Sequence, residues 1–593
     1  MNREIKKCQN CGTEFWIEPE DFKFYEKIKV PPPTWCPECR MTRKMIWRNE
    51  RGLHVRKCDL CKKETISMYS EGTKFPVYCR DCWWSDAWSP LDYEGSYDFS
   101  KTFFAQFREL KDRVPRPALS FTNVVNSKYL NYAIDAKNAY LVFGCHDVEN
   151  VAYGKIATYV KDSMDVAFTD RSELCYDVIN CTKSFKVSFS KYADDCQDSM
   201  FLLDCRNCSN CMGCVSLRNK SYCIFNKQYS KEEYKKRLAE LDLGSFKNLA
   251  KLNLEFQKYS MLFPRRFANI RNSVNVIGDD INHSRNCYAC FYLTEGSENC
   301  RYSVVLSDPV KDSSDLVNCA FSGTELLYEM ISGAGRRLFF GHKVWYGYEI
   351  IFSEDCHSSS NLFASIGLRN KSYCILNKQY TKEEYEKLVP RIIEHMNTMP
   401  YIDQKGRIYK YGEFFPPELS PFSYNETIAQ EYFPLTKEEA LEKGYSWKDP
   451  EPRNYQIQIP NDQLPDHIKD ATDDIVGQVI ECGHKGKCNE QCTEAFKIIQ
   501  PELDFLRKIN LPLPRLCPNC RHYQRIKQRN PLKLWHRKCQ CAGLTSENKV
   551  YQNTADHIHH KKDEPCPNEF ETTYAPERSE IVYCEQCYIR EVV

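Results

Sequence analysis

The chain has 593 residues, more than one hydrophobic core can organise, so we expect several domains. Its formal net charge of +1 at pH 7 singles out no class of ligand, so local charge has to decide. The first residues lack the apolar core of a signal peptide, and no apolar run reaches the roughly 18 residues of a membrane helix, which predicts a cytoplasmic protein with no membrane partner. The 33 cysteines, often spaced C-x-x-C and without an export signal, indicate metal binding rather than a disulfide scaffold.

The first segment, residues 1–96, is predicted to be a double zinc ribbon. Its cysteines form four C-x-x-C knuckles: Cys8, Cys11, Cys36, Cys39, Cys58, Cys61, Cys79 and Cys82. Tetrahedral zinc takes two knuckles per ion, and the spacing fits both consecutive pairing and a cross-braced arrangement in which alternate knuckles share an ion. Because four thiolates leave no open position for water, the predicted Zn²⁺ ions are structural, and no residue is assigned a catalytic role.

A basic segment follows the second knuckle. Between Arg40 and Lys57 seven residues are basic and one is acidic. Four of these residues are predicted to bind phosphates of a nucleic acid: Arg40, Arg43, Lys44 and Arg48. Trp47 is available to stack on a base. The alternative is a basic helix that docks on acidic edges of the rest of the protein.

The central part of the chain is predicted to be a repeat. The phrase "LRNKSYCIFNKQYSKEEY" at 217–234 returns as "LRNKSYCILNKQYTKEEY" at 368–385, and weaker matches extend this duplication upstream. Within the first copy, small polar residues recur about every 12 positions. We interpret two such segments as one coil of about 24 residues in a parallel β-solenoid.

The predicted fold is mainly β with short helices, and it places two tandem parallel β-solenoids between duplicated zinc-ribbon pairs. In chain order we expect a double ribbon at 1–96, a linker helix at 97–118, the first solenoid at 119–229, a helical linker at 230–266, the second solenoid at 267–380, a capping helix at 381–399, an extended aromatic and Pro-rich arm at 400–477, and a second double ribbon at 478–593.

The repeated phrase is interpreted as a terminating cap used twice rather than as a repeated active site. It falls at the last coil of each solenoid, before a helix that Ser230 or Thr381 would cap. Asn226 and Asn377 are expected to turn the chain. Four residues are expected to face inward: Tyr222, Ile224, Tyr373 and Ile375.

Two patterns in the first solenoid have competing interpretations. The run "CRNCSNCMGC" at 205–214 has the look of an iron–sulfur motif, but only Cys205 keeps a cysteine counterpart in the second copy, Cys356, which favours stacked structural thiols. Aspartates between Asp162 and Asp204 suit a carbohydrate-cleaving enzyme with paired carboxylates. Aspartate is also an ordinary residue of solenoid turns.

The last segment repeats the plan of the first. A shift of 481 places Cys36 on Cys517, and after a 24-residue insertion a shift of 505 places Cys79 on Cys584. The predicted ligands are Cys488, Cys492, Cys517, Cys520, Cys539, Cys566, Cys584 and Cys587. Cys482, Cys541 or a histidine can replace one of them, and this alternative stays open. The expected content is about four zinc ions per chain.

The second double ribbon also carries a basic segment, with seven basic and no acidic residues between Arg521 and Lys538. The residues predicted to contact nucleic acid here are Arg521, Arg525, Lys527 and Arg529.

Several phrases resemble those of a known family. "CPECR", "VYCRDCWWSDAW", "GLRNKSYCILNKQYTKEEY" and "CPNEFETTYAPERSEIVYCEQCY" are similar to segments of large, uncharacterised zinc-ribbon/β-solenoid proteins of small-genome uncultured bacteria. The resemblance covers almost the whole chain and implies no established activity. A CoA-transferase label sometimes given to that family has no supporting residue pattern in this sequence.

The sequence predicts a zinc-binding, non-catalytic scaffold that binds RNA or DNA, or a ribonucleoprotein, through the two basic ribbon segments. One alternative is an enzyme that acts on a carbohydrate polymer with carboxylates along the solenoid. Another is a scaffold that binds only other proteins.

Overall fold

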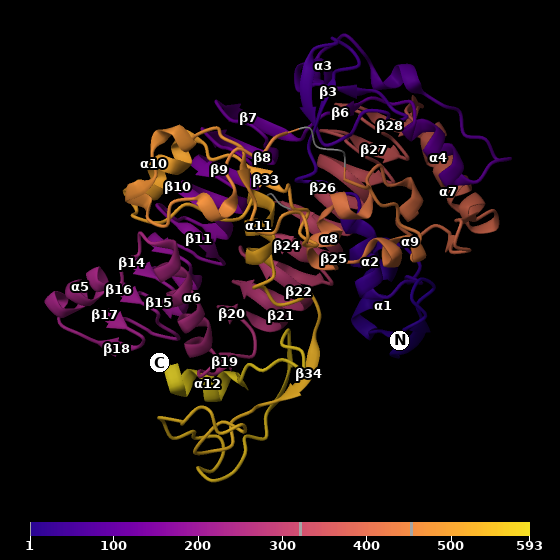
Figure 1. The fold of residues 1–593 in the computed structure, drawn as a ribbon. Helices are drawn as coiled ribbons and strands as arrows, with labels where there is room; N and C mark the ends of the chain where they lie inside the picture. Colours follow the sequence, from indigo (N-terminus) through magenta and orange to yellow (C-terminus); the bar gives the residue numbers. More distant parts are fainter. Residues whose placement is uncertain (1, 320–322, 451–454, 593) are drawn as a thin grey trace.

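The computed structural model describes residues 2–319, 323–450 and 455–592. The centre of the fold is formed by two parallel β-solenoids, which Figure 1 shows as two ladders of strands, purple to magenta for the first and pink to red for the second. The helices are α1 Pro19–Ile28, α2 Pro37–Met45, α3 Arg80–Trp84, α4 Phe103–Lys111, α5 Lys231–Glu240, α6 Phe246–Ser260, α7 Lys382–Thr398, α8 Ile428–Tyr432, α9 Lys437–Glu442, α10 Gln500–Lys508, α11 Pro518–Ile526 and α12 Glu585–Val592.

The first solenoid is one sheet of parallel strands that ends in an antiparallel hairpin, and several of its four-residue strands pair with the next strand but one in the sequence. Residues 12 positions apart are paired, as in Asn131 with Phe143 and Phe185 with Gln197. Its strands are β7 Phe121–Val125, β8 Asn131–Lys137, β9 Phe143–Ala152, β10 Lys155–Asp170, β11 Tyr176–Ile179, β12 Phe185–Ser188, β13 Lys191–Asp194, β14 Gln197–Met200, β15 Leu203–Arg206, β16 Ser209–Met212, β17 Ser221–Ile224 and β18 Lys227–Gln228.

One coil of the solenoid therefore contains 12 residues, and the predicted coil of about 24 residues is wrong. Every third residue points into the core, beginning with Ala133, Ala136 and Ala139, and the residue before each one has a positive φ. A left-handed residue turns the chain so sharply that four three-residue sides close one coil. Most of the side chains inside are small, namely Ala, Val, Ser and Cys, although Leu130 and Leu202 also belong to this core.

The second solenoid has larger side chains in its core, including Leu293, Leu327 and Met330. Its pairing offsets vary from 11 at Val274–Arg285 to 14 at Val310–Thr324. Its strands are β20 Ile270–Arg271, β21 Val274–Asn282, β22 Arg285–Leu293, β23 Glu298–Arg301, β24 Val304–Leu306, β25 Val310–Cys319, β26 Thr324–Ile351, β27 Ser360–Phe363, β28 Ser372–Ile375 and β29 Lys378–Gln379. The wider coils accommodate the larger core.

The left-handed positions explain the abundance of Asn and Asp, which tolerate a positive φ better than other residues with side chains. Several of these residues form ladders between coils. Asn126 donates to Asn138, Asn138 to Asn150, and Asn150 to Asp162, over 2.7–2.9 Å. Inward serines add a second set of links, because each accepts a backbone N–H from the next coil, as Ser163 does from Cys175 at 3.0 Å.

The repeated phrase ends each solenoid. Asn226 and Asn377 have φ of 58° and 63°, and they turn β17 into β18 and β28 into β29 as predicted. Their amides close the last coil by bonding both backbone groups of one residue, Val215 in the first copy and Ile366 in the second. The predicted inward residues are wrong: Cys223 and Cys374 lie in the two cores, Tyr222 and Tyr373 are left-handed turn residues, and Ile224 and Ile375 follow the core cysteine.

The helices that follow the two phrases begin as predicted. Ser230 accepts the backbone N–H of Glu233 and starts α5. Thr381 and Glu384 form a complete capping box at the start of α7.

Each double ribbon is built from short antiparallel hairpins and knuckle helices. In the first pair the strands are β1 Glu4–Lys7, β2 Glu14–Ile17, β3 His54–Lys57, β4 Glu64–Ser67 and β5 Val77–Tyr78, the last paired with β6 Arg116–Pro117. In the second pair they are β32 Ile480–Glu481, β33 Ala495–Phe496, β34 Trp535–Lys538, β35 Glu569–Thr572 and β36 Val582–Tyr583, the last paired with β19 Arg265–Arg266. β30 Tyr401–Ile402 and β31 Ile408–Tyr409 form a hairpin in the arm.

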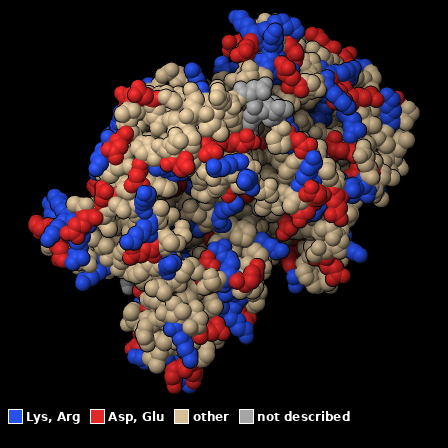
Figure 2. All heavy atoms as spheres, viewed as in Figure 1, with Lys and Arg blue, Asp and Glu red and all other residues tan. Residues whose placement is uncertain are grey.

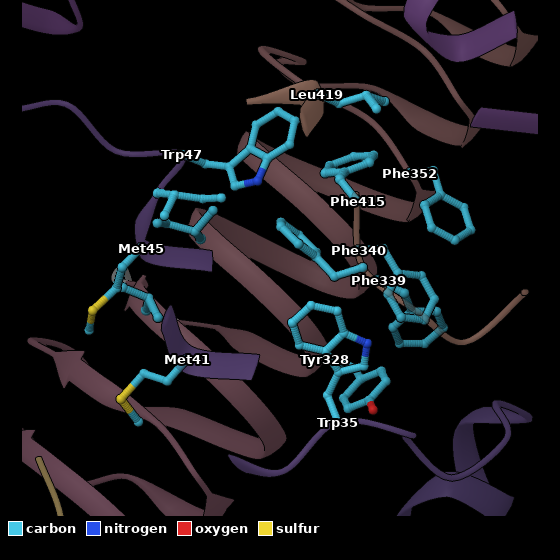
Figure 3. Packing of buried hydrophobic residues seen from close by; sticks show 14 of the residues in the cluster. Trp35, Met41, Met45, Trp47, Tyr328, Phe339, Phe340, Phe352, Phe415 and Leu419 are labelled. Carbon is cyan, nitrogen blue, oxygen red and sulfur yellow. The ribbon is translucent and has the colours of Figure 1, made fainter. Parts of the chain in front are cut away.

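The first ribbon pair docks on the second solenoid through α2, and the second pair docks on the first solenoid through α11. Figure 3 shows the first of these interfaces, where Trp47 packs beside Phe415 of the arm and Trp35 lies near Tyr328 of β26. The arm joins the two interfaces because it supplies Glu413 to α2 and Glu431 to α11. No helix in the described part of the chain is long and apolar enough to cross a membrane.

Candidate metal centres and cleft

Two four-cysteine clusters lie in the first ribbon pair. One contains Cys8, Cys11, Cys36 and Cys39, and the other contains Cys58, Cys61, Cys79 and Cys82. Consecutive knuckles therefore share a site, which was one of the two predicted arrangements. Cys11 and Cys36 sulfurs are 3.8 Å apart, and so are those of Cys61 and Cys79. A tetrahedral zinc with Zn–S bonds of about 2.3 Å requires an S···S edge of about 3.8 Å, so both clusters can hold a metal ion.

The hairpin and the helix of each ribbon place the thiols. Cys8 follows β1, whereas Cys36 is the N-cap of α2, so the backbone N–H of Cys36 reaches the Cys8 sulfur at 3.2 Å. Cys79 caps α3 and donates to Cys58 at the same distance. Hydrogen bonds from Cys36 and Cys39 lower the pKa of Cys8. Burial opposes ionisation of Cys58, but the Cys79 N–H and its neighbours lower its pKa to about 7, which favours the thiolate that a metal requires.

The third cluster differs from the predicted set by one residue. It contains Cys482, Cys492, Cys517 and Cys520, so Cys482 takes the place that was predicted for Cys488. Cys482 follows β32 and accepts the backbone N–H of Cys517 at 3.2 Å, the same contact that Cys8 makes in the first ribbon. The Cys488 sulfur lies beside the cluster, 3.6 Å from that of Cys520. The local C-x₃-C pattern pointed to Cys488, whereas only the hairpin shows the role of Cys482.

The fourth cluster contains Cys539, Cys566, Cys584 and Cys587, the set predicted from the sequence. Cys539 accepts the backbone N–H of Cys584 at 3.2 Å, as Cys58 does from Cys79. The 24-residue insertion folds back on this cluster and brings Cys541 and three histidines to it. These residues do not replace a member of the four-cysteine set. Cys541, His557 and His560 form a further group with Cys587.

The basic side chains predicted to bind phosphate are largely buried. Arg40, Arg43, Lys44, Arg48, Arg521 and Arg525 are each at most 8% exposed. The side chain of Arg529 is 7% exposed, and that of Lys527 is 63% exposed but paired with Glu490 at 2.5 Å. Trp47 is fully buried. Seven of the eight basic side chains therefore face the protein interior, where no phosphate reaches them, and the prediction that they contact nucleic acid is corrected.

Acidic residues of the solenoids explain this burial. Arg40 forms two hydrogen bonds with Asp315 of β25, at 2.8 and 3.1 Å. Arg521 and Arg525 each approach Asp165 of β10 at 2.7 Å. Ionic partners offset the desolvation of these cations, which a buried charge requires. The contacts are those of the alternative interpretation, in which the basic helices dock on acidic edges of the solenoids.

A cleft of about 2010 Å³ lies between the two solenoids. Coils of both solenoids line it, and α3 contributes Arg80, Trp83 and Trp84 to it. Trp83 is buried under Arg369, whereas Trp84 is 47% exposed. The solenoids touch beside the cleft, where Asn180 donates to Asp280 at 2.9 Å and Phe168 packs on Tyr292.

The aspartates of the first solenoid are structural residues. Asp162, Asp165, Asp177, Asp195, Asp198 and Asp204 all have a positive φ, as turn residues do. Several of them also pair with arginines, as Asp177 does with Arg525 at 3.1 Å. The four cysteines between 205 and 214 fill the inward positions of one coil, and each donates to a backbone carbonyl. Both features support the structural interpretation over the catalytic one.

The chain matches no family model and no curated protein. Among solved structures, the crystal structure of a protein described as an acetyltransferase from Desulfovibrio desulfuricans G20 is 13% identical, over 51% of this chain and 76% of the other. The TM-score of 0.10 means that this likeness carries no conclusion about fold or activity. The family resemblance noted from the sequence stays a prediction.

Proposed function

We propose that the protein is a non-catalytic scaffold that binds a single-stranded nucleic acid in the cleft between its solenoids, and that its ribbon clusters hold structural Zn²⁺. The observation that carries the proposal is the cleft itself, which combines an unusual size with aromatic and basic side chains from three parts of the chain. The ligand site is thus moved from the basic helices α2 and α11 to the cleft between the solenoids, to which α3 contributes.

The volume of the cleft favours a polymer over a small molecule. Pockets for small ligands usually enclose about 300–1,000 Å³, whereas this cleft encloses about 2010 Å³. Its walls are solenoid faces that present a side chain at regular spacing along each coil. Such a surface suits a ligand that itself repeats.

The charges of the cleft leave cations available for phosphate. Most of its carboxylates are already paired: Asp170 and Glu295 with Arg171, Asp194 with Arg271, and Asp355 with Lys343. Among the described residues of the lining, Lys183 and Lys371 form no ion pair, and Arg80 approaches only Asp81 at 4.0 Å. Cations beside aromatic rings are the usual elements of a single-strand-binding groove.

Exposed aromatic rings supply surfaces for stacking. Trp84 and Tyr159 both line the cleft, and each is 47% exposed. They come from different parts of the chain, α3 and β10, so a ligand that contacts both rings spans the cleft. Stacking of a base on such a ring contributes roughly 1–3 kcal/mol.

Zinc is the metal that best suits the four-cysteine clusters. Thiolates are soft ligands, and tetrahedral sites with four of them hold zinc or iron–sulfur groups. The hairpin-and-helix geometry around each cluster is that of a closed structural site. Metal analysis of the purified chain by mass spectrometry tests the identity of the ion, and iron or a metal content below two ions per chain would contradict it.

Fluorescence anisotropy with labelled single-stranded RNA and DNA tests the function. We expect binding that weakens as salt rises, and Lys183→Ala should lower the slope of log K against log salt by about 0.7. Trp84→Ala and Tyr159→Ala should each weaken binding about 5- to 150-fold, the equivalent of roughly 1–3 kcal/mol. Absence of binding at low salt would remove the proposal.

The chain offers matched controls for these variants. Lys186 is three residues from Lys183 and exposed, and it does not line the cleft. Tyr348 is 47% exposed, as Trp84 is, and also lies outside the lining. Lys186→Ala and Tyr348→Ala should bind as the wild type does. If they weaken binding as much as the cleft variants, the ligand lies elsewhere.

One observation favours a second candidate, an enzyme that acts on a carbohydrate polymer. Burial and the neighbouring Asp279 raise the pKa of Asp280 in the cleft to about 6, a value that suits a general acid. Reducing-sugar release from mixed polysaccharides tests this candidate. Activity that disappears in Asp280→Asn would favour it over the scaffold.

A further inference from the structure

The insertion in the last ribbon forms a second ligand group that shares one residue with the four-cysteine cluster. Cys541, His557 and His560 converge with Cys587, and Cys587 is also a member of the set with Cys539, Cys566 and Cys584. We propose that this ribbon holds two divalent zinc ions bridged by the Cys587 thiolate, so that the chain binds five ions rather than four. The proposal rests on the structural zinc of the proposed function, but not on the binding of nucleic acid.

The distances in the second group match the edges of a zinc tetrahedron. With Zn–S of about 2.3 Å and Zn–N of about 2.0–2.1 Å, the expected edges are about 3.6 Å for S···N and 3.3 Å for N···N. Cys541 Sγ is 3.2 Å from His557 Nδ1 and 3.6 Å from His560 Nε2. The two histidine nitrogens are 3.2 Å apart, and Cys587 Sγ is 3.5 Å from His560 Nε2.

Hydrogen bonds fix which ring nitrogens face the site. His557 Nε2 lies 2.9 Å from Glu591 Oε1, and this pair is buried, with side chains 2% and 0% exposed. His560 Nδ1 lies 2.9 Å from the carbonyl oxygen of Lys561. Since a carboxylate and a carbonyl only accept, these outer nitrogens carry the protons, and the inner nitrogens of both rings present lone pairs. Carboxylate and carbonyl partners of this kind are typical of metal-bound histidines.

Without a metal the centre of the group is unfavourable. Two imidazole lone pairs face each other at 3.2 Å, beside the Cys541 sulfur. A thiol proton can satisfy only one of these acceptors, and a second proton on both rings would instead bring two cations together in a buried space. One divalent ion satisfies the two nitrogens and the two sulfurs at once.

Further hydrogen bonds surround the ligands of the two proposed zinc ions. Asn553 donates to Cys541 Sγ at 3.2 Å, as Asn10 does to Cys39 and Asn568 to Cys584 in the four-cysteine clusters. Glu591, four residues after Cys587 on α12, is held by Tyr551 and Thr554. Helix α12 therefore supplies both the shared ligand Cys587 and the carboxylate of Glu591, which orients the ligand His557.

His559 lies beside the shared sulfur of Cys587. Its Nε2 lies 3.3 Å from Cys587 Sγ and 3.4 Å from Cys566 Sγ. We assign His559 as a hydrogen-bond donor to the bridging thiolate and not as a ligand.

The N-terminal ribbon provides an internal comparison, since it lacks the insertion. Only two residues separate Cys58 from Cys61, whereas 26 separate Cys539 from Cys566. Three of the four ligands of the second ion lie in those 26 residues. The insertion therefore supplies most of the ligands of the second ion, and the first ribbon pair has no such insertion.

The test is the metal content and the metal–metal coupling of the full chain. Purified wild-type protein should contain five zinc ions by mass spectrometry, and His557→Ala and Cys541→Ser should contain four. His536→Ala changes an exposed histidine of the same ribbon that pairs with Glu569 and Glu571, and it should keep five. Four ions in the wild type, or five in both ligand variants, would overturn the proposal.

A second measurement needs no variant and so does not depend on how the variants fold. After exchange of zinc for ¹¹³Cd, NMR should show four resonances of four-sulfur sites and one of a mixed sulfur and nitrogen site. The mixed-site resonance should be split by coupling through Cys587 to one of the others. Five uncoupled resonances, or four alone, would contradict the bridge, whatever the outcome of the nucleic-acid experiments.

Discussion

The two ribbon–solenoid interfaces are copies of one interface, and each joins a terminal ribbon pair to the solenoid that is farther from it in the sequence. Arg40 and Asp315 in one correspond to Arg521 and Asp165 in the other, at the sequence shifts that relate the two halves. The first ribbon lies on the second solenoid, whereas the second ribbon lies on the first. The basic residues were duplicated together with their acidic partners, which indicates that they serve this docking.

A tyrosine and a carboxylate complete each copy. Asp21 of α1 accepts a hydrogen bond from Tyr302 at 2.9 Å, and Glu502 of α10 accepts one from Tyr153 at 2.6 Å. The arginine beside each pair stacks on the tyrosine ring, with Arg521 4.5 Å from the centroid of Tyr153. The hydrogen bond from tyrosine to carboxylate is thus kept in both copies, although Asp21 in the first corresponds to Glu502 in the second.

The copies differ one turn beyond the knuckle helix. Arg48 stacks on Tyr132, 3.7 Å from its ring centroid, whereas its counterpart Arg529 lies 3.7 Å from Asp280. Tyr132 and Asp280 follow Asn131 and Asp279, which cap equivalent coils by accepting the N–H groups of Ser120 and Asn269. A tyrosine ring in one copy thus stands where a carboxylate stands in the other.

Removal of the metal should have the largest effect and should break both interfaces. A chelator strong enough to extract the ions removes about 10–16 kcal/mol of binding energy from each structural site. We expect hydrogen exchange to rise throughout residues 4–84 and 480–592, while the inward strands of the solenoids stay protected. Ribbons that keep their protection without metal would show that docking alone holds them.

Loss of the shared ion pair should affect both copies alike. Asp315→Ala and Asp165→Ala each remove the nearest carboxylate from buried arginines, at a cost of at most about 3–5 kcal/mol. Glu329 in one copy, and Glu502 and Asp177 in the other, remain as partners. The free energy of local opening, measured by hydrogen exchange in α2 or α11, should fall by this amount. Asp312→Ala is the control, because Asp312 pairs with the exposed Lys27 and should cost at most about 1 kcal/mol. Unequal losses at Asp315 and Asp165 would show that the copies have diverged in energy.

The pH dependence should distinguish the two copies. Burial and Asp279 raise the pKa of Asp280 from 3.8 to about 6, so the folded protein binds this proton more tightly than the unfolded chain does. Stability should therefore fall as pH rises from about 4 to 6, by up to about 3 kcal/mol from this group. Asp280→Asn should flatten this part of the pH profile of hydrogen exchange in α11. The profile in α2, where Tyr132 stands in place of Asp280, should not change.

The terminal caps should give the smallest effect and separate the two solenoids. Asn377 is fully buried and bonds Ile366 and the carbonyl of Pro90, whereas Asn226 is half-buried and bonds Val215 alone. Replacement by alanine leaves backbone groups unsatisfied, at about 1–3 kcal/mol each, and should cost more at Asn377. Hydrogen exchange of the last coils measures this difference. Equal losses would mean that the bonds to the preceding coil dominate.

The sequence predicted much of the architecture because its duplications can be recognised as repeated sequence motifs. The repeated phrase located both solenoid ends, and the cysteine spacings identified 15 of the 16 cysteines of the four four-cysteine clusters. It left Cys482 only as an alternative to Cys488, because nine residues separate Cys482 from its partner Cys492 and no short motif marks the pair. It also gave the wrong coil length, since a spacing of 12 fits either half of a coil or a whole one until the strands are seen to pair.

The sequence by itself determined the parts and the charges: duplicated knuckles, two repeats rich in small residues, and two basic helices. Only the tertiary structure decided what those charges face. The sequence of a basic segment does not show whether its side chains lie in water or against carboxylates. The partners of Arg40 and Arg521 are 275 and 356 residues away in the sequence, and only the fold brings them together. The same is true of Cys587, whose two roles depend on an insertion that must fold back before its histidines can reach the bridging sulfur.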